Sequence, residues 1–159
     1  MDERGSPRVG LGVDLHGWDL EAELWLGGVR FEGVAGLSGH SDGDVVCHAI
    51  ADGVLGAAAL GDLGEHFPDD APETRGIGGV DLLRRTVALA SALGLAPSGC
   101  DVTVICELPA IAPRRDEMRE RIAEATGISS ARVSVKATRP EGLGLSGDGI
   151  GAMAVVVLT

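Results

Sequence analysis

Residues 8–16 read Arg-Val-Gly-Leu-Gly-Val-Asp-Leu-His, and this alternation of residue types predicts a β-strand. Successive side chains of a strand point to opposite faces, so Asp14 and His16 are expected on one face. The other face is expected to point into a hydrophobic core and carries Leu11, Val13 and Leu15. The strand therefore places two side chains of metal-binding types side by side. Such residues often pair only with each other or with the backbone and bind no metal.

A third metal-binding side chain follows in residues 42–52, Asp-Gly-Asp-Val-Val-Cys-His-Ala-Ile-Ala-Asp. A spacing of four residues places Asp44, His48 and Asp52 on one stripe of a helix. One carboxylate and two imidazoles suit Zn²⁺ or a similar divalent ion, with the fourth position left for water or substrate. Asp42 and Asp44 have an alternative interpretation as helix-start carboxylates, and Asp52 as a residue that only orients His48.

The chain as a whole predicts an α+β fold. Strands are expected over residues 8–16, 24–31, 100–106, 132–138 and 152–158, and helices over residues 44–60, 80–93 and 114–125. Gly27-Gly28 suggests a hairpin or a bulge, Ser41 or Asp42 is expected to cap the first helix, Gly61 to end it, and residues 61–79 to form a long functional loop. Strand pairs that bracket helices favour a single-domain sandwich, in which a mixed sheet of four to five strands carries helices on one face. Residues 1–7 are predicted to be a disordered lead and residues 8–159 one domain.

Composition excludes several classes of function. The chain has 159 residues, a formal net charge of -11 and one lysine, Lys136, which argues against a nucleic-acid surface. No apolar run approaches the roughly 20 residues of a membrane span, and no signal peptide opens the chain, so a soluble, cytoplasmic protein is expected. Cys47, Cys100 and Cys106 are odd in number and form no C-x-x-C pair, so we expect buried free thiols.

Short blocks with a specific character follow one another along nearly the whole chain. They are residues 8–16, Gly39-His-Ser-Asp-Gly-Asp44, His48, Ala57-Ala-Ala-Leu-Gly-Asp-Leu-Gly64, Phe67-Pro-Asp69, Pro109, Val135-Lys-Ala-Thr138 and Glu141. In this order they resemble the 2-C-methyl-D-erythritol 2,4-cyclodiphosphate synthase family. The resemblance implies a homotrimer with each active site between adjacent subunits, acting in isoprenoid precursor biosynthesis. It also implies an intramolecular reaction: the 2-phosphate of 4-diphosphocytidyl-2-C-methyl-D-erythritol 2-phosphate attacks the β-phosphorus and expels CMP, so the protein mainly positions the substrate and neutralises charge.

The same resemblance assigns roles to residues. Asp14, His16 and His48 would bind Zn²⁺, and Glu141 would bind a second ion, Mg²⁺ or Mn²⁺. The catalytic residues implied are His40, Arg139 and Glu141, with His40 and Ser41 meeting the attacking phosphate near a helix N-terminus. Asp62 and Gly64 would meet the ribose hydroxyls, Phe67 and Asp69 the methylerythritol part, and residues 106–112 the cytosine. The substrate-binding residues implied are Ser41, Asp62, Gly64, Phe67, Asp69, Cys106, Pro109, Ala110, Ile111, Ala112, Thr138 and Leu145.

Some positions depart from the family pattern. Ala110 stands where the family usually has Lys, Arg139 where it has Thr, Leu145 where it has Phe, and Asp148 where it has an Arg near the threefold axis. Arg139 is itself a good phosphate clamp, whereas Asp148 would repel a diphosphate effector at the axis.

Three interpretations follow. The first is a functional synthase in which peripheral residues, but not the metal ligands, depart from the family pattern. The second is a diverged paralogue that keeps the metal but acts on another phosphorylated metabolite, or is a non-catalytic trimeric binding protein. The third, independent of the family, is a zinc hydrolase that uses metal-bound water, with Asp44 or Asp52 as its base.

Overall fold

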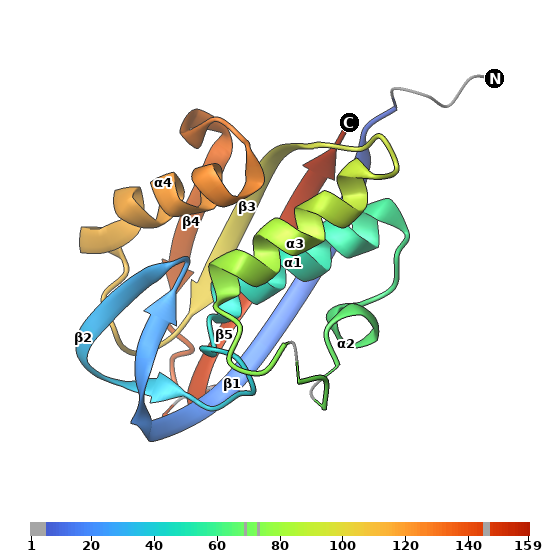
Figure 1. Ribbon diagram of the computed structural model, residues 1–159. Coiled ribbons are helices and arrows are strands. Elements are labelled where there is room, and N and C mark those ends of the chain that lie inside the picture. Colours follow the sequence, from blue (N-terminus) through green and yellow to red (C-terminus); the bar gives the residue numbers. More distant parts are fainter. Residues whose placement is uncertain (1–5, 69, 73, 145–146) are drawn as a thin grey trace.

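The strands of the protein form one mixed sheet. The computed structural model describes residues 6–68, 70–72, 74–144 and 147–159. The sheet has five strands in the order β2-β1-β5-β3-β4 (Figure 1). Their bounds are β1 Arg8–Leu26, β2 Val29–Leu37, β3 Pro97–Ile105, β4 Val133–Thr138 and β5 Gly149–Leu158. Only β3 and β4 run parallel to each other, and the other neighbours are antiparallel, which confirms the predicted mixed sheet.

The helices lie on one face of this sheet, as predicted. Their bounds are α1 Val45–Ala58, α2 Leu63–His66, α3 Gly79–Ser91 and α4 Arg115–Thr126, with short 3₁₀ turns at Ala112–Arg114 and Ser130–Arg132. Helix α1 packs directly on β1 and β5, α3 packs on α1, and α4 lies beside α3 and over β4 (Figure 1). Among the described residues, no helix is long and apolar enough to span a bilayer.

Strand β1 is longer than the sequence predicted. Its first half, Arg8 to Gly17, pairs with β5, and its second half, from Trp18, pairs with β2. The segment predicted as one strand over residues 24–31 is therefore the end of β1 and the start of β2, joined at Gly27-Gly28. Both glycines have left-handed backbones, with φ of 59° and 74°, which suits a tight hairpin turn. Of the two structures expected at Gly27-Gly28, a hairpin or a bulge, the chain forms the hairpin.

The first helix begins and ends at residues other than those predicted. Its N-cap is Asp44, rather than Ser41 or Asp42, and its C-cap is Ala59, which is left-handed, so Gly61 is not the stop. Residues 61–79, predicted as loop, contain the short helix α2, which Asp62 caps through the amide of Glu65. The other predicted helices and strands are present, with bounds shifted by up to three residues.

Asp44 joins the first hairpin to the first helix. Its Oδ1 accepts the amides of Gly27 (2.8 Å), Val46 (3.1 Å) and Cys47 (3.0 Å), and its Oδ2 accepts that of Gly28 (2.7 Å). The side chain is fully buried, and a buried carboxylate requires such donors to compensate for lost water. The interpretation of Asp44 as a helix-start carboxylate is therefore confirmed.

The expected orientation of β1 is wrong. Gly10, Gly12 and Asp14 face α1, whereas the opposite side chains are exposed: Leu11 is 57%, Val13 44% and Leu15 55% accessible. A Cβ on Gly12 would lie 1.8 Å from the carbonyl oxygen of Ala49. The glycine positions therefore let α1 lie against the strand backbone, and the leucine and valine side chains take the open face. Met153 and Val155 of the neighbouring strand β5 are exposed on the same open face.

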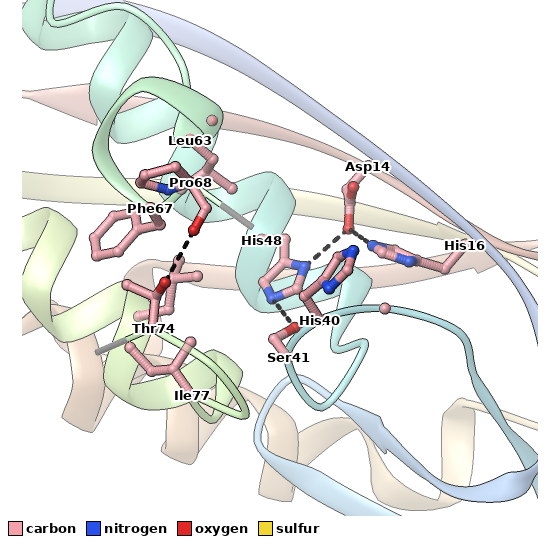
Figure 2. Close-up of a pocket in the computed structure, with 13 residues that line it drawn as sticks. Asp14, His16, His40, Ser41, His48, Leu63, Phe67, Pro68, Thr74 and Ile77 are labelled. Carbon is pink, nitrogen blue, oxygen red and sulfur yellow. Dashed lines mark hydrogen bonds and ion pairs between the residues drawn. The ribbon is translucent and has the colours of Figure 1, made fainter. Parts of the chain in front are cut away.

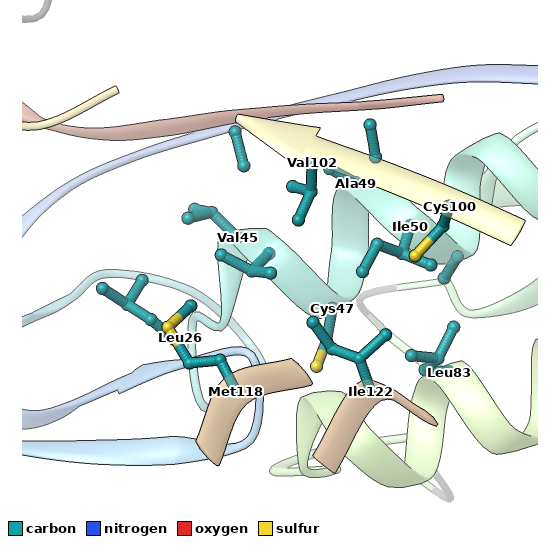
Figure 3. Packing of buried hydrophobic residues seen from close by; sticks show 14 of the residues in the cluster. Leu26, Val45, Cys47, Ala49, Ile50, Leu83, Cys100, Val102, Met118 and Ile122 are labelled. Carbon is teal, nitrogen blue, oxygen red and sulfur yellow. The ribbon is translucent and has the colours of Figure 1, made fainter. Parts of the chain in front are cut away.

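The core lies between the sheet and the helices. Figure 3 shows Val45, Cys47 and Ile50 of α1 between Val102 of β3 and Ile122 of α4. Cys47, Cys100 and Cys106 are buried free thiols, as predicted. Burial raises the pKa of Cys100 to about 12 and that of Cys106 to about 11.

We predict that Gly12→Ala lowers the free energy of unfolding by about 3 kcal/mol, because the added methyl group overlaps the α1 backbone. The matched control is Gly56→Ala in α1, whose added Cβ would lie 3.9 Å from the nearest atom, at ordinary contact distance. That variant should be neutral or more stable by up to about 1 kcal/mol. Urea unfolding of both variants measures the difference, and equal stabilities would contradict the close packing of α1 on β1.

Candidate metal centre

Three side chains from two elements converge at one end of the α1–β1 contact. Nε2 of His16 lies 3.0 Å from Oδ2 of Asp14, and Nδ1 of His48 lies 3.1 Å from the same oxygen. One ligand atom from each of the three residues lies within 4.8 Å of the others. Asp14 and His16 share a face of β1, as predicted, and His48 comes from the first turn of α1 (Figure 2).

The second nitrogen of each imidazole is also engaged. Nδ1 of His16 contacts the carbonyl oxygen of Ser38, and a carbonyl only accepts, so Nδ1 carries a proton and Nε2 faces Asp14. Nε2 of His48 lies 3.1 Å from Oγ of Ser41, which leaves Nδ1 toward Asp14. Metal-ligating histidines typically have such outer partners, because these orient the ring and fix the tautomer.

The donor set fits a divalent ion. Three ligands at about 2.1 Å from a tetrahedral ion lie about 3.4 Å from one another, and the two distances to Asp14 are only slightly shorter. Burial alone would raise the pKa of Asp14, but hydrogen bonds and charge from His16 and His48 outweigh it and lower this pKa to about 2. The aspartate is thus ionised at neutral pH, as metal binding requires.

The other acidic residues near the cluster have structural roles. Asp42 accepts the amides of Gly79 (2.8 Å) and Asp44 (3.1 Å), so it ties the start of α3 to the loop before α1. Burial and the neighbouring charge of Asp44 raise the pKa of Asp42. Asp52 does not orient His48 as suggested, because both imidazole nitrogens face Asp14 and Ser41.

A cavity of about 250 Å³ adjoins the metal cluster. Figure 2 shows Leu63, Phe67 and Pro68 across this cavity from His48. The predicted site residues that line it are Asp14, His16, His40, Ser41, His48, Gly64 and Phe67. Asp62 does not line it, and Asp69 lies outside the described residues. Lining residues that sequence reasoning missed include Leu63, Pro68, Thr74 and Ile77, because apolar and small polar residues in a loop carry no chemical signature.

Some of the amides near the helix N-terminus, where a phosphate is expected, are already engaged within the protein. Asp44 already accepts the first free amides of α1, those of Val46 and Cys47. The amide of Gly43 donates to Oγ of Ser41 (3.2 Å).

A second cavity, of about 290 Å³, lies at the carboxyl ends of β3 and β4. It gathers the predicted nucleotide-binding residues, which are Cys106, Pro109, Ala110, Ile111, Ala112, Thr138 and Arg139. Arg115 also lines this cavity. It was not predicted from the sequence, because a single arginine at the start of a helix indicates no ligand. The two cavities share no lining residue, so one chain presents two separate parts of the predicted site.

Glu141 lies in neither lining but has an unusual backbone. Its φ is 53°, and Ala59 is the other non-glycine residue with positive φ in the described part of the chain. This conformation costs about 1–2 kcal/mol for a residue with a Cβ, and such strain concentrates at functional sites. Leu145 lies outside the described residues.

His66 is the last residue of α2 and was not identified from the sequence. Its ring is half-buried, and its Nε2 lies 2.7 Å from the carbonyl oxygen of Leu60.

A mixed sheet whose first strand and first helix bring together three side chains that could hold a metal ion defines a class of α+β proteins with a candidate metal site. Within that class, a family profile described as the YgbB family matches residues 7–159, and the chain belongs to this family.

Curated relatives and solved structures agree with this assignment. The 2-C-methyl-D-erythritol 2,4-cyclodiphosphate synthase of Trichlorobacter lovleyi is 46% identical over 153 residues, covering 95% of this chain and 98% of that protein. The bifunctional enzyme IspD/IspF of Anaeromyxobacter dehalogenans is 51% identical over 94% of this chain, and the chain spans only 39% of that relative's length. A CDP-bound structure of 2C-methyl-D-erythritol-2,4-cyclodiphosphate synthase has a TM-score of 0.89 and 30% identity, covering 96% of this chain and 100% of that chain. An IspF CDP complex from Plasmodium falciparum has a TM-score of 0.81 and 30% identity, covering 96% and 95%.

We predict that His48→Ala abolishes tight binding of a divalent ion, because only two of the three ligands remain. Ser41→Ala, which removes the outer contact to His48 together with the bond from the amide of Gly43, should weaken ion binding by roughly tenfold. Elemental analysis after dialysis against a graded chelator measures both effects.

His66→Ala is the matched control for this experiment, since it removes a half-buried imidazole that lies outside the cluster. Its ion content should equal that of the unaltered protein. An His48→Ala protein that keeps its ion through dialysis would refute the proposed ligand set.

Proposed function

We propose that this chain is a 2-C-methyl-D-erythritol 2,4-cyclodiphosphate synthase. It would convert 4-diphosphocytidyl-2-C-methyl-D-erythritol 2-phosphate to the cyclic diphosphate with release of CMP, in isoprenoid precursor biosynthesis. The observation that carries the proposal is the Asp14, His16 and His48 cluster beside a cavity, in a chain whose full-length relatives carry this name. We also propose that residues 8–159 act as one domain and that the protein is cytoplasmic.

The proposed assembly is a homotrimer with active sites between subunits. Two observations support it. The metal-side cavity and the β3–β4 cavity are separate within one chain, so a substrate that needs both is completed by a neighbouring copy. The helix-free face of β1 and β5 also exposes an apolar strip that a second copy would cover. Its members are Val9, Leu11, Val13, Leu15, Met153 and Val155.

The proposed metal ligands are Asp14, His16 and His48 for Zn²⁺ and Glu141 for Mg²⁺ or Mn²⁺. When bound, such ions polarise phosphate oxygens as Lewis acids and offset the charge of the diphosphate. That compensation matters because the chain carries a formal net charge of -11 and would otherwise repel a polyphosphate.

The reaction needs little covalent chemistry from the protein. An oxygen of the substrate's 2-phosphate forms a bond to the β-phosphorus, and the bond from that phosphorus to the bridging oxygen breaks, so CMP leaves with the electron pair. We propose that His40 and Ser41 orient the attacking phosphate in the metal-side cavity, which they line. Thr138 and Arg139 would hold the nucleotide diphosphate in the other cavity.

The remaining roles concern recognition of the substrate. Asp62 and Gly64 would meet the ribose hydroxyls, and Phe67 and Asp69 the methylerythritol part. The loop over residues 106–112 would hold the cytosine largely through its backbone, and Cys106 to Ala112 line the β3–β4 cavity. Leu145 is proposed to lie near the substrate on the basis of the resemblance alone.

We expect that the purified protein with 4-diphosphocytidyl-2-C-methyl-D-erythritol 2-phosphate, Zn²⁺ and Mg²⁺ yields CMP and the cyclic diphosphate in phosphorus NMR. Solution mass and elemental analysis of the same sample serve as controls for assembly and metal content. Unchanged substrate in a trimeric, zinc-loaded sample would reject the synthase and favour the diverged paralogue.

We predict that Glu141→Gly separates stability from activity. Removing the side chain relieves the left-handed strain, so the free energy of unfolding should stay unchanged or rise by up to about 1 kcal/mol. Turnover should fall at least about 100-fold, since a charge-neutralising ligand is lost.

Ala59→Gly is the matched control for Glu141→Gly, because Ala59 is left-handed as well and lies at the exposed C-cap of α1. It should gain similar stability and keep full turnover. Full turnover in Glu141→Gly, or a loss of stability above about 1 kcal/mol, would contradict the functional interpretation of the strain.

A further inference from the structure

In the cavity beside the metal cluster, the wall that lies opposite the cluster is formed by a very short helix and the residues that follow it. Leu63, Gly64, Phe67 and Pro68 line the cavity, and they belong to or directly follow α2 (Figure 2). Helix α2 has only four residues. A helix of this length has no stability of its own in water, because nucleation costs more than its few hydrogen bonds return. The wall must therefore be held in place by contacts with the rest of the protein.

The backbone of Leu63 hydrogen-bonds to Asp52 of α1, and some other polar contacts of the wall stay within it. Oδ1 of Asp62 accepts the amide of Glu65 at 3.2 Å, and the amide of Phe67 donates to the carbonyl oxygen of Leu63 at 2.8 Å. The bonds within the wall shape α2 but do not fix where it lies. Leu63 and Phe67 also pack partly against the core. This apolar contact attracts α2 to the core, but it is non-directional and does not fix the exact position of the helix.

His66 supplies a second directional tie, at the opposite end of α2 from Leu63. Its Nε2 donates to the carbonyl oxygen of Leu60 at 2.7 Å. The amide of Leu60 in turn donates to the carbonyl oxygen of Leu55 at 3.0 Å, so Leu60 is hydrogen-bonded to the C-terminal turn of α1. The imidazole thus connects the cavity wall to the same helix that carries His48 at its other end.

We propose that His66 is a positioning residue for substrate binding. By hydrogen bonding to Leu60 it holds α2 at a fixed distance from α1, and so places Asp62 and Gly64 where the ribose of the nucleotide meets them. The inference rests on the proposed function, which assigns the ribose contact to those two residues. The bond needs only a proton on Nε2, which both the neutral Nε2–H tautomer and the protonated ring provide.

Two amide replacements test the direction of the bond. The amide nitrogen of glutamine is separated from Cβ by the same number of bonds as Nε2 of histidine, whereas that of asparagine corresponds to Nδ1. His66→Gln should therefore keep the bond to Leu60, while His66→Asn and His66→Ala should lose it. Glutamine also keeps the experiment interpretable if the alanine variant does not fold.

The measurement is calorimetric titration of the zinc-loaded trimer with CDP and with 2′,3′-dideoxy-CDP. For CDP, we expect His66→Asn and His66→Ala to bind about tenfold more weakly than the unaltered protein, and His66→Gln within about threefold of it. For the dideoxy ligand, which lacks the ribose hydroxyls, all variants should bind within about twofold of one another. In turnover assays the same variants should raise KM with kcat preserved.

The outcomes separate this inference from the proposed function. If the unaltered protein binds no CDP, the synthase assignment fails. If it binds CDP and the Gln and Asn variants behave alike, or if the loss is equal for CDP and the dideoxy ligand, His66 does not position the ribose contact and the inference is overturned.

Discussion

The buried carboxylate of Asp44 is the constraint on which the metal centre depends. It accepts four backbone amides, two from the Gly27-Gly28 turn and two from the first turn of α1. Because the turn ends β1 and the helix carries His48, one side chain fixes the two elements whose side chains meet at the cluster. A carboxylate removed from water is costly unless its oxygens are satisfied, so the hairpin and the helix start are held together as one unit. Any movement of either would leave amides and carboxylate unpaired.

Glycine at alternate positions of β1 completes this arrangement. Gly10 and Gly12 have no Cβ, so the backbone of α1 lies directly against the strand. The close approach allows Nδ1 of His48 to come within 3.1 Å of Asp14. Larger residues in place of Gly10 and Gly12 would push α1 away from β1, and the imidazole of His48 would no longer reach the carboxylate of Asp14. Helix packing and ligand geometry are thus consequences of the same small residues.

The proposed chemistry places a polyphosphate on an acidic protein, and the structure shows how the charge is arranged. The metal-side cavity gathers Asp14 with imidazoles that favour a cation, and the separate β3–β4 cavity contains Arg115 and Arg139. Two arginines therefore line the cavity proposed to hold the nucleotide diphosphate, beside Glu107. In the proposed assembly, the exposed apolar strip on the open sheet face brings copies together, so that both cavities serve one substrate. In this arrangement, the wall that His66 holds decides how accurately the sugar is placed between them.

The sequence by itself determined the class of fold and the chemistry of the cluster. Alternation in residues 8–16 and helical spacing around His48 are local patterns, and backbone geometry alone translates them into a strand, a helix and a converging set of ligands. The tertiary structure decided which face of β1 is covered, because alternation defines two faces but the close packing of α1 on Gly10 and Gly12 chooses between them. It also decided that Asp44 is a cap and that His66 is a tie, since both roles depend on amides and carbonyls that no side-chain pattern encodes. Contacts between backbone groups distant in sequence exist only once the chain has folded, which is why they had to be seen in three dimensions.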